Sequence, residues 1–152
     1  MRKTFLALAV LLAVSGPAAA QRSHVGVHAG YDFDRDVALA GGQLSLPLSR
    51  FVELYPSADV YFVSSGSLLG LNGDLKLRLR PGAPLQTYVG GGVNFLSAHP
   101  QGGGPGATDT GWDLFVGFES RRGYVHPYLE GRVQEHTRSV FHLLGGLNIT
   151  LF

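Results

Sequence analysis

The 152-residue sequence contains no cysteine. This excludes a scaffold stapled by disulfide bonds, and it excludes a lipid attached through a cysteine. Lysine and arginine form no basic patch of the kind that nucleic-acid phosphates require, so we expect no nucleic-acid partner. The stability of the fold must therefore come from a sheet, a packed core or a membrane.

Long apolar runs are also missing. The longest, Phe5–Val14, has ten residues, whereas a membrane-spanning helix needs about 20. It follows the basic residues Arg2 and Lys3 and precedes small alanines that end at Ala20, which is the layout of a secretory signal peptide. We therefore predict export of the chain and cleavage after Ala20.

The prediction divides the chain into a signal peptide, 1–20, and a mature part, 21–152. Arg2 and Lys3 account for two of the 12 basic residues, which leaves 10 against 11 acidic residues and a net charge of −1 for the mature part. No stretch of it shows a helical period of 3.6 residues or a helix-capping pattern. We predict one all-β domain over 21–152.

Turn residues cut the mature part into eight segments of strand length. The predicted strands are 24–33, 36–46, 51–63, 68–80, 84–97, 109–119, 123–135 and 139–152. An even number of antiparallel strands places both ends of the chain on one side. The longest connection, 98–108, then lies on the opposite side, and the connections beside the chain ends are short.

The segment 68–80 shows the clearest alternation. One face carries Leu69, Leu71, Leu75, Leu77 and Leu79, and the other carries Asn72, Asp74, Lys76, Arg78 and Arg80. Consecutive side chains of a strand point to opposite faces, so one face of this strand is leucine and the other is charged. The first, sixth, seventh and eighth segments alternate in the same way. The run 90–92 is all glycine, and we interpret it as a bend that helps a narrow barrel to close.

Alternation alone leaves open which face points outward. In a membrane barrel the apolar face meets lipid and the lumen is polar. Inside eight strands, charges of both signs can neutralise one another by pairing. The predicted polar network of the lumen is Glu53, Asp59, Asp74, Lys76, Arg78, Glu130 and Arg132.

Aromatic residues gather near the ends of the predicted strands, which is typical of the girdles at the two membrane interfaces. The predicted girdle is Tyr31, Phe62, Phe95, Trp112, Phe118 and Phe141. About ten residues per strand, tilted near 40°, also match the height of an apolar band of about 25 Å. We therefore favour an eight-stranded antiparallel up-and-down transmembrane β-barrel.

The chain resembles the small outer-membrane barrels of the OmpA/OmpX type. The resemblance covers the whole mature part, and its sharpest element is the last strand. Gly146, Ile149, Leu151 and Phe152 are similar to the C-terminal signal that the barrel-assembly machinery of such proteins recognises, with Phe152 one position late.

The resemblance implies a Gram-negative outer-membrane protein, in contact with outer-membrane lipids and lipopolysaccharide. It implies a non-enzymatic envelope-structural or cell-surface role, with no cofactor and with a filled lumen rather than a general pore. Two alternatives stay open. One is a soluble periplasmic barrel that binds an apolar ligand and has its leucines inside. The other is a lipid A-modifying enzyme.

No catalytic or metal-binding pattern stands out. For the enzyme, His126 and Glu130 share one strand face, but no local His-x-Ser motif is present. Asp32, Asp34 and Asp36 form D-x-D-x-D, but the glycine and glutamate of an EF-hand loop do not follow. His24, His28, His126 and His142 are expected to point into the lumen as hydrogen-bonded side chains. We predict no catalytic residue and no metal site.

Overall fold

The computed structural model describes residues 22–102 and 104–151, and these residues form eight antiparallel strands and no helix. The strands are β1 His24–Asp32, β2 Val37–Pro47, β3 Val52–Tyr61, β4 Ser67–Arg78, β5 Leu85–His99, β6 Ala107–Ser120, β7 Val125–Glu135 and β8 Ser139–Thr150. The predicted signal peptide, 1–20, lies outside the described residues, as does Phe152. No helix in the described ranges is long and apolar enough to cross a membrane.

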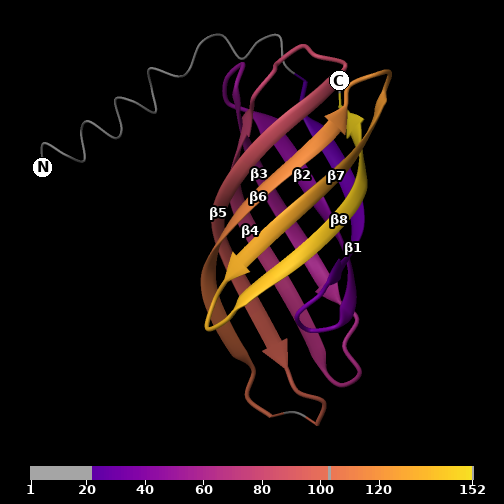
Figure 1. Ribbon diagram of the computed structural model, residues 1–152. Helices are drawn as coiled ribbons and strands as arrows, with labels where there is room; N and C mark the ends of the chain where they lie inside the picture. The colour runs from indigo at the N-terminus through magenta and orange to yellow at the C-terminus, as the bar shows by residue number, and fades with distance from the viewer. Residues whose placement is uncertain (1–21, 103, 152) are drawn as a thin grey trace, which may run out of the picture.

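Each strand pairs with its neighbours in the sequence, and β1 pairs with β8 to close the barrel. His24 lies opposite Thr150 at one end of this last seam, and Asp32 lies opposite His142 at the other. The strands are strongly tilted and both ends of the described chain lie at the same end of the barrel (Figure 1). The predicted fold class, a closed eight-stranded antiparallel barrel, is confirmed.

The hairpin of β5 and β6 is longer than the sequence predicts. The predicted strands stop at 97 and resume at 109, but pairing continues to Ala98 opposite Ala107. The Oγ of Ser97 lies 3.5 Å from the Oγ1 of Thr108, so short polar side chains continue the cross-strand contacts. The connection between the two strands shortens accordingly, and this hairpin projects furthest at the end opposite the chain termini (Figure 1).

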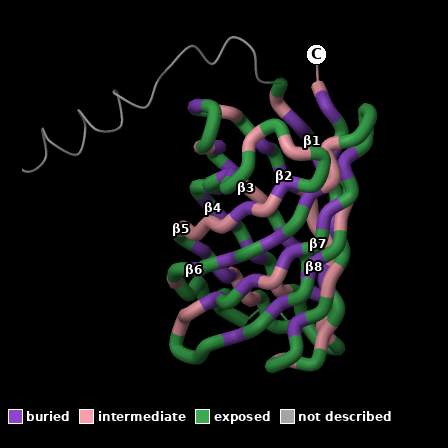
Figure 2. Tube along the Cα trace, turned by 45° about the horizontal axis from the view of Figure 1, so that its top comes forward, coloured by how far each residue is buried: buried purple, intermediate pink, exposed green. Residues whose placement is uncertain are grey.

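Buried and exposed residues alternate along most of the barrel strands (Figure 2), with runs of half-buried residues in β2 and β5. The leucines of β4 are on the exterior: Leu69, Leu71, Leu75 and Leu77 are each more than 40% exposed. The charged side chains of the same strand, Asp74, Lys76 and Arg78, are buried. The soluble alternative required these leucines to point inward, and the structure places them outward.

The exterior is almost free of charge. Among the outward-facing residues of the eight strands, the ionisable acidic and basic side chains are Glu135 and His99, at the last positions of β7 and β5. The predicted girdle residues all face outward: Tyr31, Phe62, Phe95, Trp112, Phe118 and Phe141. Such an apolar surface, continuous around the barrel, is far larger than a soluble monomer exposes to water.

The glycines at 90–92, interpreted from the sequence as a bend, also provide space inside the barrel. They lie inside β5, where pairing with both neighbouring strands runs on without a break. Gly90 faces the interior beneath the ring of Phe115, and Gly92 faces it beside Asp74. A missing side chain at these positions therefore makes room for a large or charged side chain of the adjacent strand.

Replacing Gly90 with valine is expected to destabilise the barrel by about 1–3 kcal/mol, which is the usual cost of overpacking. A Cβ at this position would lie 2.6 Å from Phe115 Cε2 and 2.5 Å from the backbone oxygen of Leu75. Urea-dependent unfolding in lipid vesicles measures the effect. Gly73→Ala is the matched control, since its Cβ would meet Val93 Cγ2 at 3.7 Å, an ordinary contact. Equal stability of the two variants would contradict the prediction.

Candidate functional site

The candidate site is the interior of the barrel, which we call the bore. We call the end with the chain termini the terminal rim; its connections are 48–51, 79–84 and 121–124. The other end, the loop rim, has connections at 33–36, 62–66, 100–106 and 136–138. The even strand number and the chain ends at one side fix this division.

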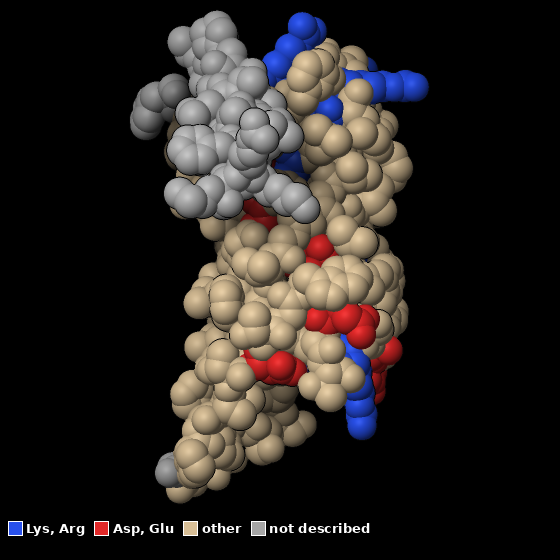
Figure 3. Space-filling model, turned by 90° about the vertical axis from the view of Figure 1, so that its left-hand side faces the viewer, with Lys and Arg blue, Asp and Glu red and all other residues tan. Residues whose placement is uncertain are grey.

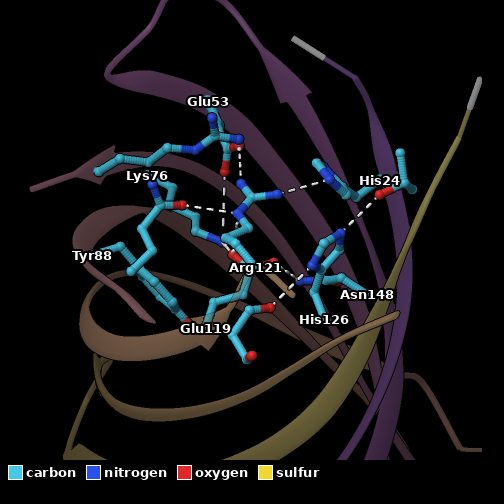
Figure 4. A network of polar contacts seen from close by, with 12 residues as sticks. His24, Glu53, Lys76, Tyr88, Glu119, Arg121, His126 and Asn148 are labelled. Atoms are coloured by element: carbon cyan, nitrogen blue, oxygen red, sulfur yellow. Dashed lines mark hydrogen bonds and ion pairs between the residues drawn. The ribbon is translucent and has the colours of Figure 1, made fainter. Parts of the chain in front are cut away.

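An ionic cluster fills the bore near the terminal rim (Figure 4). The Nζ of Lys76 lies 3.1 Å from Glu119 Oε2 and 3.5 Å from Glu53 Oε2. Glu53 also pairs with Arg78, and its Oε1 lies 3.5 Å from Arg121 Nη2. Three cations thus face two carboxylates, so the cluster carries a net positive charge.

Aromatic rings lie next to this cluster, deeper in the bore. The ammonium of Lys76 lies 4.0 Å from the ring centroid of Tyr88 and 4.7 Å from that of Tyr55. Phe115 packs against both tyrosines, and all three side chains are buried. Cation–π contacts of a desolvated ammonium are worth about 2 kcal/mol. The rings therefore stabilise a buried lysine and block the bore at this level.

The centre of the bore is organised around Arg132. Its Nη1 lies 2.8 Å from both Asp74 Oδ2 and Asp113 Oδ2, and its Nη2 lies 3.1 Å from Glu130 Oε1. The guanidinium also lies 4.5 Å from the ring centroid of Phe115. One cation holds three carboxylates here, so the charge balance is the reverse of that at the terminal rim.

Amide and imidazole groups continue the network towards the loop rim. His28 lies 2.5 Å from Asp59 Oδ1 through Nε2 and 2.6 Å from Gln43 Oε1 through Nδ1. Asn72 donates to Asp59 Oδ2 at 2.8 Å. An apolar cluster also lies in the bore, and its members are Leu39, Tyr61, Leu96 and Leu144.

The structure places all seven predicted network residues inside the bore, but in separate groups. Glu53, Lys76 and Arg78 share the cluster at the terminal rim; Asp74, Glu130 and Arg132 share the central one; Asp59 is bound to His28. The predicted network omitted Glu119, Asp113 and Arg121. The alternation of β6 identifies Glu119 and Asp113 as inward-facing, whereas Arg121 follows the strand and carries no such signal.

The residues of the predicted insertion signal are divided between the two faces of β8 and its end. Gly146 faces the bore beneath the ring of Tyr128, while Ile149 is exposed on the exterior. Leu151 is half-buried, and its backbone nitrogen donates to Ser23 at 2.8 Å. The positions of these residues do not test whether an assembly machinery recognises them, so that recognition stays a prediction.

The four bore histidines have separate partners. His24 contacts Arg121, His28 contacts Asp59, and His142 contacts Asp32. His126 lies 2.8 Å from Thr150 Oγ1 and 3.0 Å from the backbone oxygen of Ser120. In the described parts of the chain no three His, Cys, Asp or Glu side chains are grouped to hold a metal ion.

The two rims differ in charge. At the terminal rim, arginines come from four separate places in the sequence: Arg22, Arg50, Arg80, Arg121 and Arg122. Within residues 22–102 and 104–151, no acidic side chain is exposed at this rim. Figure 3 shows most of the basic atoms at this end and the acidic ones below them. The turns thus bring together arginines that no local run of residues groups, and the expectation that the chain has no nucleic-acid partner stays a prediction.

The loop rim is acidic. Its exposed or half-exposed carboxylates are Asp34, Asp36, Asp109 and Glu135, opposed by Arg35 and Arg138. Burial lowers the pKa of His136, which lies in the β7–β8 connection, below its ordinary value. The shift favours the neutral form of this histidine, so the four carboxylates of the rim are opposed mainly by the two arginines.

Solved structures share this architecture. The N-terminal β-barrel domain of Pseudomonas aeruginosa OprF is 17% identical, over 86% of this chain and 98% of that domain, with a TM-score of 0.75. Neisserial surface protein A is 12% identical over 85% of this chain and 97% of its own, with a TM-score of 0.68. The attachment invasion locus protein Ail of Yersinia pestis is 10% identical over 86% and 97%, with a TM-score of 0.61.

No protein-family model and no curated protein matches the sequence. The likeness therefore lies in the fold. The strand number agrees with that of those barrels, and the alignments cover nearly their full length. The apolar exterior with a charged bore is the arrangement of a transmembrane barrel. The chain thus has the fold of the small eight-stranded outer-membrane β-barrels of the OmpA/OmpX type.

Proposed function

We propose that this protein is an integral barrel of a bacterial outer membrane, exported by a cleaved signal peptide, with a non-enzymatic structural or cell-surface role and a closed bore. The observation that carries the proposal is the inversion of the usual burial pattern. Leucine, valine and aromatic side chains cover the outside of all eight strands, and ionic groups fill the inside. Lipid is the solvent in which that distribution is stable.

A closed bore follows from what fills it. The rings of Tyr55, Tyr88 and Phe115 span one level, and Leu39, Tyr61, Leu96 and Leu144 span another. Between these levels Arg132 pairs with carboxylates that come from three strands. Eight strands enclose a space that side chains of this size occupy fully.

Reconstitution into a planar lipid bilayer is expected to give no steady, large conductance, because ions would have to displace two levels of packed side chains. The purified protein should also require detergent for extraction and should migrate faster on a gel before heating than after. A constant open current from the wild-type protein would contradict a closed bore. Release by osmotic shock without detergent would contradict the membrane location.

The absence of an enzymatic role rests on the bore geometry. His126 contacts a threonine hydroxyl and a backbone oxygen, and the Oγ of neither Ser120 nor Ser139 is among its partners. A serine nucleophile needs its base within hydrogen-bond reach. Overexpression should therefore leave lipid A chemically unchanged by mass spectrometry, and His126→Ala should alter nothing in that profile. A modified lipid A that disappears in the variant would establish an enzyme instead.

The proposed partners follow from the orientation. The girdle and the leucine exterior would contact outer-membrane lipids, and the loop rim would face lipopolysaccharide on the cell surface. Insertion would use the barrel-assembly machinery through the last strand, with Gly146, Ile149, Leu151 and Phe152 as the recognised residues. Crosslinking from a photoreactive residue placed at Ile149 during export tests that contact. Absence of any crosslink to the machinery would count against it.

A further inference from the structure

Two adjacent hollows open at the terminal rim, one on each side of Arg78 and Arg121. The first has a volume of about 290 Å³ and is also lined by Arg22, His24 and His126. The second has a volume of about 460 Å³ and is also lined by Arg122. Among the described residues, the linings of the two hollows together hold four guanidinium groups and two imidazoles, and none of these lining residues is acidic.

The fold holds these arginines together despite their charge. The backbone nitrogen of Arg121 donates to the backbone oxygen of Pro84 at 2.8 Å, which ties the β6–β7 turn to the β4–β5 turn. The side chain of Arg121 then extends over the opening of the bore at the terminal rim, which we call the mouth. Its Nη1 lies 2.8 Å from His24 and its Nε lies 3.0 Å from Gln86 Oε1 (Figure 4). Arg121 is thus held through both its backbone and its guanidinium, so the charged group is positioned rather than freely solvated.

The carboxylates inside the bore do not neutralise the positive charge at the mouth. Glu53 and Glu119 are shared among Lys76, Arg78 and Arg121, which leaves one positive charge over. Arg22 and Arg122 add two more, and neither has an ion-pair partner within the described residues. Like charges gathered this closely destabilise a fold unless an anion joins them.

A buried imidazole with an unpartnered nitrogen also belongs to the lining of the first hollow. His24 is 5% exposed and lines that hollow, and its Nδ1 has no hydrogen-bond partner among the described residues. A polar atom that is buried without a partner is costly, so a ligand that bonds to it stabilises the site. An anionic acceptor with several oxygens would therefore form hydrogen bonds with both the imidazole and the guanidinium groups.

We propose that the mouth at the terminal rim is a binding site for a phosphate group, either free phosphate or the phosphate of a lipid headgroup. A phosphate offers several charged oxygens in a tetrahedral arrangement, and guanidinium groups donate to such oxygens in pairs. Arg22 and Arg121 line the first hollow from two separate segments of the chain, so a phosphate there can accept hydrogen bonds from more than one direction; Arg121 and Arg122 line the second. In the proposed membrane orientation the rim lies at the depth of the periplasmic headgroups.

The test uses the full gene product, extracted from membranes in a neutral detergent. Inorganic phosphate is titrated in one arm, and a short-chain phosphatidylglycerol in micelles of the same detergent in the other, both by isothermal titration calorimetry. Saturable heat in either arm is expected. Heat with phosphate alone identifies the free anion as the ligand, and heat with the lipid alone identifies a headgroup. Absence of saturable heat in both arms overturns the proposal.

The matched variants are Arg22→Gln and Arg122→Gln, because both side chains are exposed and outside the ion pairs that hold the bore. Each loss of a charge-assisted hydrogen bond should weaken binding about tenfold. Arg138→Gln at the loop rim is the control, expected to bind as the wild type does. Unfolding in urea shows that all three variants are folded. Equal weakening in all three, or in none, would overturn the site at this rim.

Discussion

Replacing Arg132 with methionine is expected to lower the free energy of unfolding by about 3–5 kcal/mol, the typical cost of removing one partner from a buried ion pair. Arg132 is 2% exposed and contacts Asp74, Asp113 and Glu130 at 2.8 to 3.1 Å. Methionine has a similar length but no charge, so three carboxylates would remain together without a cation. Urea-dependent unfolding in lipid vesicles, followed by the fluorescence of Trp112, measures the loss.

A rescue variant separates lost charge from lost packing. Combining Arg132→Met with Asp74→Asn and Asp113→Asn removes two of the stranded carboxylates and keeps the volumes nearly constant. It should recover most of the lost stability, since replacing a whole buried ionic group by neutral residues is often neutral. Arg138→Met, exposed at the loop rim, should change stability by less than about 0.5 kcal/mol. If Arg132→Met unfolds at the urea concentration of the wild type, the central cluster does not hold the bore together.

The fold was predictable because its main signal is local. A strand buried on one face repeats every two residues, and segment 68–80 shows this period in leucines against charged residues without reference to any other strand. Turn residues mark where one strand ends and the next begins, and an even number of strands places both chain termini at the same end of the barrel. Each of these features can be seen within a dozen neighbouring residues, so the inward or outward direction of a strand residue follows from the sequence.

The grouping of the bore residues was not predictable, because it depends on register across the whole barrel. That Gly90 lies opposite Phe115 and Gly117 opposite Tyr88 follows from the stagger of β5 against β6, and one strand alone does not set that stagger. The glycines of this sequence therefore gave no sign that Gly90 and Gly117 provide space for the rings of Phe115 and Tyr88. The same register decides which carboxylates meet Arg132.

The basic terminal rim is a second feature that the sequence of single segments does not predict. Arg22, Arg50, Arg80 and the pair at 121–122 are far apart in the sequence, and the mature part has a net charge near zero. Charge composition therefore suggested no anion-binding surface. Closure of the barrel brings all the turns of one end into a ring, and a hydrogen bond between two of these turns then orients Arg121 across the mouth. Only topology converts scattered arginines into a site.

Replacing Leu71 with arginine is expected to destabilise the barrel by about 2–4 kcal/mol in lipid vesicles, the cost of a basic side chain on the lipid face near the bilayer midplane. Leu71 is 58% exposed, lies near the middle of β4 and is flanked by Ala58 and Phe95 on the adjacent strands. The measurement is again unfolding in urea. The matched control is Leu85→Arg, which is 60% exposed at the terminal end of β5 and should cost about 0–1 kcal/mol.

The comparison of these two leucines tests whether lipid or water surrounds the barrel, and it does not depend on packing inside the barrel. Both side chains are about equally exposed, so in water an arginine at either position would be nearly neutral, and the two variants would behave alike. In a bilayer the cost depends on depth, because the arginine at Leu85 reaches the headgroups and the one at Leu71 does not. A large penalty at Leu71 with a small one at Leu85 therefore indicates acyl chains against the middle of β4. Equal, small penalties would remove the membrane location, and with it the assignment of the terminal rim to a layer of headgroups.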